Sequence, residues 1–141
     1  MADRILNDEI VKDLKTTFKQ LESEVTVSVF TKEGENDQYN ELTRQLITEI
    51  AEVDKRIKPE FHKVGGPESE RFGVHSSPTL LICPDKYRIM LRGAPLGEEG
   101  RTLVMALIMA SSGRGAIREP SVKKLQKLED RRLVKVFVSP T

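Results

Sequence analysis

The sequence contains one cysteine, Cys83, among its 141 residues. A single thiol excludes an intrachain disulfide, a C-x-x-C redox pair and a thiolate-rich metal site on this chain. We interpret Cys83 as a small apolar residue at the end of a buried strand. The weakest of the readings that we weigh is a free-standing enzyme that uses Cys83 alone.

The chain also lacks a long apolar run and an excess of either charge. The longest apolar stretch, residues 103–110, is too short to cross a bilayer, and residues 1–4 lead directly into a mixed-charge helix. We therefore expect a cytoplasmic protein with no membrane partner. The formal net charge is +1, and acidic Glu129 and Asp130 interrupt the one basic cluster. This pattern is typical of a solvated helix face, so we expect no nucleic-acid partner.

No residue pattern in the sequence suggests a metal or a cofactor. His62 and His75 lie on either side of a glycine-rich break, without the spacing of a helical metal site. We expect both histidines at the surface. Glu98 and Glu99 fit the start of a helix, where carboxylates stabilise the helix dipole, and need no catalytic explanation.

Apolar periodicity predicts alternating helices and strands. The expected helices cover residues 7–22, 36–53, 68–72 and 102–110. The expected strands cover residues 25–30, 57–64, 79–83 and 87–91. This order indicates an α/β layer fold, in which a parallel βαβ unit joins an antiparallel hairpin and helices cover both faces.

The second helix has the clearest stripe. Its apolar residues Tyr39, Leu42, Leu46, Ile50 and Val53 follow helical spacing, and Asn36 or Asp37 is the expected N-cap.

A helix-then-strand pattern recurs near the C-terminus. Val27-Ser28-Val29-Phe30 follows the first helix, and Val134-Lys135-Val136-Phe137 follows a shorter amphipathic helix. We therefore divide the chain into a domain over residues 1–112, a linker over 113–120 and the truncated start of a second unit over 121–141. The last expected strand, residues 133–138, should pair with a sheet edge of another chain, as in a homodimer, or lie disordered.

One segment resembles thioredoxins. Phe72-Gly73-Val74-His75-Ser76-Ser77-Pro78-Thr79 is similar to the loop that leads into the third sheet strand of that family. The resemblance implies the thioredoxin fold, with a central four-stranded mixed sheet flanked by helices. It also implies a cis peptide bond before Pro78, because the matching proline of the family is cis and faces the redox site.

A second segment narrows the resemblance. Gly93-Ala94-Pro95-Leu96-Gly97-Glu98-Glu99, followed by Leu103-Val104-Met105-Ala106-Leu107, is similar to the N-terminal half of tandem thioredoxin-fold proteins. These are the protein disulfide oxidoreductases of thermophiles and the N-terminal region of the flavoprotein subunit of alkyl hydroperoxide reductase. The resemblance implies two thioredoxin-like (glutaredoxin-like) units in series. It implies as partners the second unit and a peroxiredoxin or a thioredoxin reductase-like flavoprotein.

The sequence departs from the family where catalysis takes place. An active unit carries C-x-x-C after its first strand, where a helix N-terminus stabilises the thiolate. Here that stretch is Thr31-Lys32-Glu33-Gly34-Glu35-Asn36-Asp37-Gln38, which has no cysteine. The unit is therefore expected to be redox-inactive, like the first unit of the flavoprotein. Ser139-Pro140-Thr141 is similar to the step that precedes C-P-x-C in the second unit of the family.

Two functions follow from these observations. The first is a non-catalytic thioredoxin-fold domain that supports or orients a C-x-x-C-bearing second unit in electron transfer to protein disulfides. The second is a stand-alone binding module. Its groove, beside Ser76, Ser77 and Pro78, would hold an extended peptide through strand-like hydrogen bonds.

Overall fold

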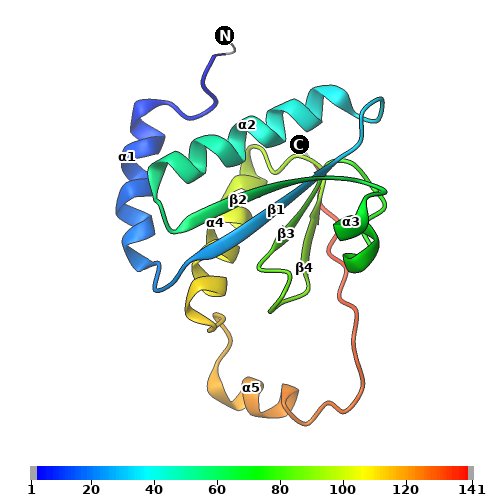
Figure 1. Cartoon of the computed structure of the whole chain (residues 1–141). Helices are drawn as coiled ribbons and strands as arrows, with labels where there is room; N and C mark the ends of the chain where they lie inside the picture. Colours follow the sequence, from blue (N-terminus) through cyan, green and yellow to red (C-terminus); the bar gives the residue numbers. More distant parts are fainter. Residues whose placement is uncertain (1–2, 140–141) are drawn as a thin grey trace.

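A four-stranded mixed sheet forms the centre of the computed structural model, which describes residues 3–139 (Figure 1). The strands are β1 (Val25–Thr31), β2 (Ile57–Lys63), β3 (Thr79–Ile82) and β4 (Ile89–Arg92). Their order across the sheet is β2-β1-β3-β4. β1 pairs with β2 in parallel and with β3 antiparallel, and β3 pairs antiparallel with β4. The expected βαβ unit and hairpin are therefore confirmed.

Five α-helices accompany the sheet in the described part of the chain. They are α1 (Asp8–Thr17), α2 (Asp37–Val53), α3 (Pro67–Phe72), α4 (Glu98–Ser112) and α5 (Glu119–Leu125), and a 3-10 turn, η1 (Phe18–Gln20), continues α1. Figure 1 shows α4 behind the sheet and α5 below the rest of the domain. Among residues 3–139, no helix combines the length and the apolar character needed to cross a membrane.

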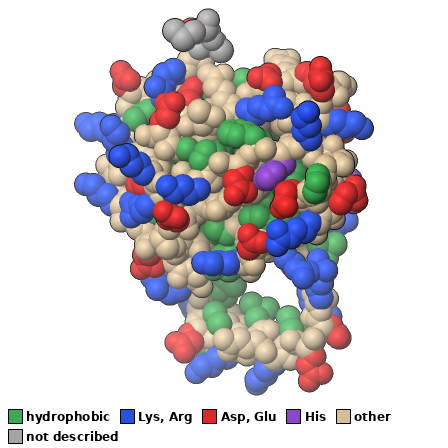
Figure 2. Space-filling view, viewed as in Figure 1, with side chains coloured by type: hydrophobic (Ala, Val, Ile, Leu, Met, Phe, Trp, Pro, Cys, Tyr) green, Lys and Arg blue, Asp and Glu red, His purple; other side chains and the backbone are tan. Residues whose placement is uncertain are grey.

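The two faces of the sheet carry cores of different size. Val25, Val27 and Val29 of β1 point to the larger core, which also contains side chains of α1, α2 and α4. The intervening Phe30 points to a smaller core with Val74 and Leu81, beside α3. This alternation is the period of two of a strand buried on both faces. The view in Figure 2 shows acidic and basic side chains interspersed over the face that it presents.

Glu49 of α2 holds the segment that precedes α1. Its carboxylate accepts hydrogen bonds from the backbone N–H of Ile5 at 3.1 Å and of Leu6 at 2.8 Å. The Gln45 amide donates to it as well, at 2.9 Å. A buried carboxylate with three donors is compensated for its lost hydration.

The end of α4 is tied to the segment just before β1. The hydroxyl of Ser111 accepts a hydrogen bond from the Glu22 N–H at 3.1 Å, and the Ser23 hydroxyl donates to the Ser111 carbonyl at 2.6 Å. Arg114 then forms an ion pair with Glu22 at 2.9 Å. The chain therefore leaves the domain from a fixed point.

The predicted strand over residues 133–138 is wrong for this structure, in which the segment has no regular secondary structure. Its five apolar side chains are 64% to 90% exposed. A strand requires a neighbour for its backbone hydrogen bonds, and the described chain places none beside it. The helix before it does form, as α5. The division into residues 1–112, 113–120 and 121–141 stays a prediction.

Two details of α2 also differ from the expectation. Tyr39 is 52% exposed, and the buried face of the helix instead includes Asn40, Thr43, Ile47 and Ile50. Asn36 precedes the helix in the left-handed conformation, and its side chain makes no N-cap hydrogen bond. The Asn36 side chain donates to the Ser77 carbonyl instead of capping the helix, and Asn40 is directed inward to the Ser77 hydroxyl.

Candidate functional site

The expected site lies where the loop before β3 meets the end of β1 and the start of α2. The Ser77–Pro78 peptide bond is cis, the isomer that the resemblance implies. Ser77 and Pro78 are buried, whereas Ser76 is half-buried. The carbonyl oxygen of Pro78 accepts a hydrogen bond from the Gly93 N–H at 2.9 Å, which fixes the loop to the far end of β4.

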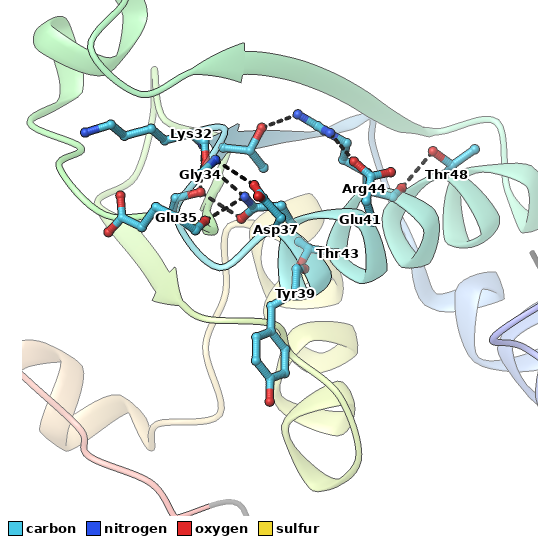
Figure 3. A network of polar contacts seen from close by, with 12 residues as sticks. Lys32, Gly34, Glu35, Asp37, Tyr39, Glu41, Thr43, Arg44 and Thr48 are labelled. Atoms are coloured by element: carbon cyan, nitrogen blue, oxygen red, sulfur yellow. Dashed lines mark hydrogen bonds and ion pairs between the residues drawn. The ribbon is translucent and has the colours of Figure 1, made fainter.

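Residues 32–37, here called the 32–37 loop, occupy the position at which an active unit carries its cysteines. The Gly34 N–H donates to the Asp37 carboxylate at 2.8 Å, which closes a tight turn before α2. The Asn40 amide donates to the carbonyls of Lys32 at 3.0 Å and Glu35 at 2.8 Å (Figure 3). Asn40 is 3% exposed, so this side chain fixes the loop from inside.

Ser77 joins the 32–37 loop to the cis-proline. Its hydroxyl donates to the Asn40 amide oxygen at 2.7 Å and accepts from the Lys32 N–H at 2.7 Å. The Asn36 amide donates to the Ser77 carbonyl at 2.8 Å. Among the described residues, no buried side-chain nitrogen or oxygen lacks a partner. The loop and the proline therefore form one satisfied polar network.

Thr31, the last residue of β1, is held by a cation from α2. The Arg44 guanidinium donates hydrogen bonds to the Thr31 hydroxyl and to the Glu41 carboxylate (Figure 3). Thr31 is 3% exposed. The hydroxyl of Thr31 is thus buried and bonded to a cation, whereas activation of a nucleophile requires a base within hydrogen-bond reach.

The expected peptide groove is half occupied. The Ser77 carbonyl, which an extended peptide would need as an acceptor, is already bound by Asn36. The Ser77 N–H makes no hydrogen bond within residues 3–139. One donor of the strand-like edge therefore remains available, and the acceptor beside it does not. The binding role of Ser76, Ser77 and Pro78 stays a prediction.

Sequence reasoning missed the residues that complete this network. No role was predicted for Asn40, and Asn36 was predicted only as a helix cap. The sequence does contain a signal that Asn40 is buried. Asn40 precedes the buried Thr43, Ile47 and Ile50 by three, seven and ten residues. These spacings place it on the same helix face.

The other candidate residues lie away from the network. Cys83 is half-buried at the opposite end of β3 from Pro78, and its N–H donates to the Thr26 carbonyl at 2.8 Å. His62 stacks on Phe30 with ring centroids 5.1 Å apart, and His75 is exposed. In the described residues, no group of three or more His, Cys, Asp or Glu side chains is arranged to hold a metal ion. The similarity of 139–141 to a pre-cysteine step concerns Pro140 and Thr141, which lie outside the described residues.

Sequence comparisons alone give no relative. No protein-family model matches the chain, and a search of curated proteins finds no match.

Comparison with solved structures gives clear similarities. The alkylhydroperoxide reductase protein AhpF from Enterococcus faecalis superposes with a TM-score of 0.74 at 22% identity, over 87% of this chain and 61% of that chain. An N-terminal domain of the same protein gives a TM-score of 0.72 at 22% identity, over 85% and 59%. A protein disulfide oxidoreductase from Aeropyrum pernix gives 0.77 at 21% identity, over 93% and 58%.

These similarities establish a thioredoxin-like fold for the chain. Both kinds of protein that the sequence resembles are among its structural neighbours. The chain spans 58% to 61% of the length of each of these three.

Proposed function

We propose that this chain is a non-catalytic thioredoxin-fold domain of a thiol-disulfide oxidoreductase. It would support and orient a second unit that carries C-x-x-C and transfers electrons to protein disulfides. One observation carries the proposal: the position of the cysteine pair is filled by the 32–37 loop, which Asn36 and Asn40 attach to Ser77 and to the backbone around it.

This loop is built for stability and not for exchange. Dithiol exchange requires an accessible thiolate at a helix N-terminus that can approach a substrate disulfide. Here the start of α2 presents a turn closed by Asp37, and its polar groups are directed inward to Lys32, Glu35 and Ser77. The thioredoxin-like fold is therefore retained without its chemistry.

The structural neighbours supply the context of the proposal. One is named a protein disulfide oxidoreductase and two are structures of an alkylhydroperoxide reductase protein, and each is longer than this chain. We therefore propose as partners a second thioredoxin-like unit of the same polypeptide and a peroxiredoxin or thioredoxin reductase-like flavoprotein. The setting would be the cytoplasm, where reductants keep such thiols available.

Two measurements test the proposal. In an insulin-reduction assay with dithiothreitol, the 141-residue chain should not exceed the rate of dithiothreitol alone, and Cys83→Ser should behave identically. Turnover that is lost in Cys83→Ser would instead assign an enzyme to this chain. In the reading frame after Thr141, C-P-x-C should follow at once, and a stop codon there would contradict the tandem arrangement.

A second candidate function is supported by the unbonded N–H of Ser77. As a peptide-binding module, the chain should select a sequence from a displayed random-peptide library. Asn36→Gly would release the Ser77 carbonyl and restore a donor and acceptor pair, so it should tighten binding of the selected peptide. Failure of both proteins to enrich any peptide would eliminate this alternative.

A further inference from the structure

The arginines of the domain up to Arg114 fall into two groups. Arg88, Arg92 and Arg101 are exposed, and no hydrogen bond or ion pair holds their guanidinium groups within residues 3–139. Glu98 lies on the first turn of α4, close to Arg101 in the sequence, but forms no ion pair with it. The other arginines each pair with a nearby carboxylate: Arg4, Arg44, Arg56, Arg71 and Arg114. The unpaired guanidinium groups can therefore bind carboxylates of another molecule.

The unpaired arginines lie along one edge of the domain. Arg88 precedes β4 and Arg92 ends it, and β4 is an outer strand of the sheet (Figure 1). Arg101 belongs to α4 and faces Ile89 of β4 across a hollow. Residues 86–97 include no acidic side chain. This edge is therefore locally basic, although the formal net charge of the whole chain is only +1.

The hollow between β4 and α4 is apolar and has a volume of about 410 Å³. Methionine side chains contribute much of its surface, and Met105 is 43% exposed. Methionine adapts to apolar groups of different shape and is frequent on surfaces that bind varied peptides. The complete lining is Ile89, Arg101, Thr102, Met105, Ala106 and Met109. An apolar side chain of a partner would thus enter beside a single cation, Arg101.

The side chains of β4 alternate between the two faces of the sheet. Ile89 points to the larger core and to α4, whereas Met90 and Arg92 point to the opposite face. Because β4 is an outer strand, a partner that approaches it from the open side meets both faces. Such a partner would contact the hollow on one side of the strand and Arg92 on the other. It must therefore combine an apolar group with carboxylates beside it.

We propose that this surface, here called the arginine edge (Arg88, Arg92, Arg101 and the hollow), binds an acidic protein segment with an apolar anchor residue. The anchor would fill the hollow, and aspartate or glutamate side chains next to it would pair with the arginines. A guanidinium group can bind a carboxylate through two parallel hydrogen bonds. Burial of the anchor supplies most of the affinity, while the charges select the partner and speed its association.

The charge of the arginine edge argues against other occupants. A twofold contact of two copies through this edge would place the same unpaired arginines against one another. A nucleic acid offers anionic phosphates but no apolar side chain for the hollow. Residues 133–138 take no part, so a second unit can use them in its own sheet. The inference does not depend on the proposed function, because all the groups that it uses lie between Arg88 and Met109.

Short synthetic peptides test the proposal by fluorescence anisotropy with the 141-residue chain. The first probe is a labelled peptide of glutamates around two central leucines. Replacement of its leucines by serine should raise the Kd by about tenfold or more, because the hollow is then left uncovered. Replacement of its glutamates by lysine should abolish binding. Higher salt should weaken binding of the acidic leucine peptide, because exposed charges are screened.

Variants of the chain locate the binding surface. Arg92→Gln and Arg101→Gln should each raise the Kd of the acidic leucine peptide by about threefold to tenfold. Lys12→Gln is the matched control, because it removes the same charge from an exposed position on α1, and it should change the Kd by less than about twofold. Met105→Gln should weaken binding of the leucine peptide and leave the serine peptide unchanged. All four positions are exposed, and circular dichroism would verify that each variant is folded.

Methyl NMR of the methionines gives an independent measurement. The acidic leucine peptide should shift the methyl signals of Met105 and Met109, which line the hollow. Equal binding of the lysine peptide would overturn the proposal, and so would an equal effect of Lys12→Gln and Arg101→Gln. Competition by a single-stranded oligonucleotide that shifts the same methyl signals would assign the surface to nucleic acid instead. Self-association of the chain that shifts these signals without peptide would assign the surface to a second copy.

Discussion

The hydroxyl of Ser77 donates a 2.7 Å hydrogen bond to the amide oxygen of Asn40, and both residues are buried. Ser77 precedes the cis-proline and Asn40 lies on the first turns of α2, 37 residues away in the sequence. In this chain, the site that the fold uses for thiols is held together by an amide and a hydroxyl.

Loss of the Asn40 side chain should destabilise the domain. Asn40→Ala removes hydrogen bonds to Ser77, Lys32 and Glu35 and leaves the buried Ser77 hydroxyl without its acceptor, so the free energy of unfolding should fall by about 2–3 kcal/mol. Urea denaturation measures the change. Gln38→Ala, an exposed position on the same helix, should change it by less than about 0.5 kcal/mol. Equal effects of the two substitutions would refute the role of the network.

The carboxylate of Glu49 should make stability depend on pH. Burial by itself raises the pKa of Glu49. Hydrogen bonds from the Leu6 N–H, the Gln45 amide and the Ile5 N–H, with the charge of Arg4, outweigh burial and hold the pKa below its ordinary value. A depressed folded-state pKa stabilises the fold above the unfolded-state pKa, and this contribution is lost as the pH falls through the folded-state pKa.

Glu49→Gln should therefore reduce the free energy of unfolding by about 1–2 kcal/mol at neutral pH. The difference from the parent protein should shrink as the solution is acidified, which urea titrations at several pH values would measure. Glu52→Gln is the matched control, because Glu52 also pairs with Arg4 but has a side chain that is 58% exposed. Glu52→Gln should lower the free energy of unfolding by less than about 0.5 kcal/mol. A pH-independent difference for Glu49→Gln would contradict the assignment.

Arg56 should not be replaceable by lysine. Its guanidinium donates to the carbonyls of Phe18 at 2.8 Å and Leu21 at 2.6 Å, which begin and follow η1, and also to the Asp54 carboxylate. Lysine keeps the charge but lacks the planar fork that reaches several acceptors at once. We expect Arg56→Lys to lower the urea midpoint nearly as far as Arg56→Ala does. Retention of the parent midpoint by Arg56→Lys would show that charge alone is sufficient.

Replacement by alanine should change the stability of the domain in opposite directions at Gly73 and at Gly100. Gly73 ends α3 with φ +68, and although a Cβ there meets no atom within 4 Å, the left-handed conformation disfavours it. Gly73→Ala should therefore lower the free energy of unfolding by about 1 kcal/mol. Gly100 lies inside α4, where a Cβ would make an ordinary 3.6 Å contact with the Pro95 carbonyl oxygen. Gly100→Ala should therefore raise the free energy of unfolding by about 0.5–1 kcal/mol. Thermal unfolding of both variants checks the pair, and a shift of the same sign in both would refute the explanation.

The sequence allowed the sheet to be predicted because its strands are short and their apolar residues alternate or run without interruption. β1 and β2 were predicted to within one residue at their ends. Pro78 was recognisable because a family motif surrounds it. Periodicity fixes which residues are buried, and a motif fixes one unusual peptide bond.

The polar network could not be predicted in the same way. Asn40 and Glu49 are buried through partners far away in the sequence, and hydrophobic patterns do not register such residues. The prediction that Tyr39 is buried was wrong for a related reason. An apolar stripe does not indicate that the neighbouring Asn40 is directed inward to Ser77, which leaves Tyr39 exposed. The expected strand over residues 133–138 was wrong. Its alternating apolar pattern is compatible with a strand, but a strand forms only beside another strand, and the described chain places none there.

The bonds from Ser111 to Glu22 and Ser23 have a mechanical consequence for whatever follows α4. They attach the exit of the chain to the segment just before β1, so that the end of α4 is held and does not fray. Between Gly113 and Arg118 only six residues precede α5, a tether of about 20 Å at full extension. Whatever follows α4 is therefore held within a short reach of its end, and a pull on the linker acts through these hydrogen bonds on the segment just before β1.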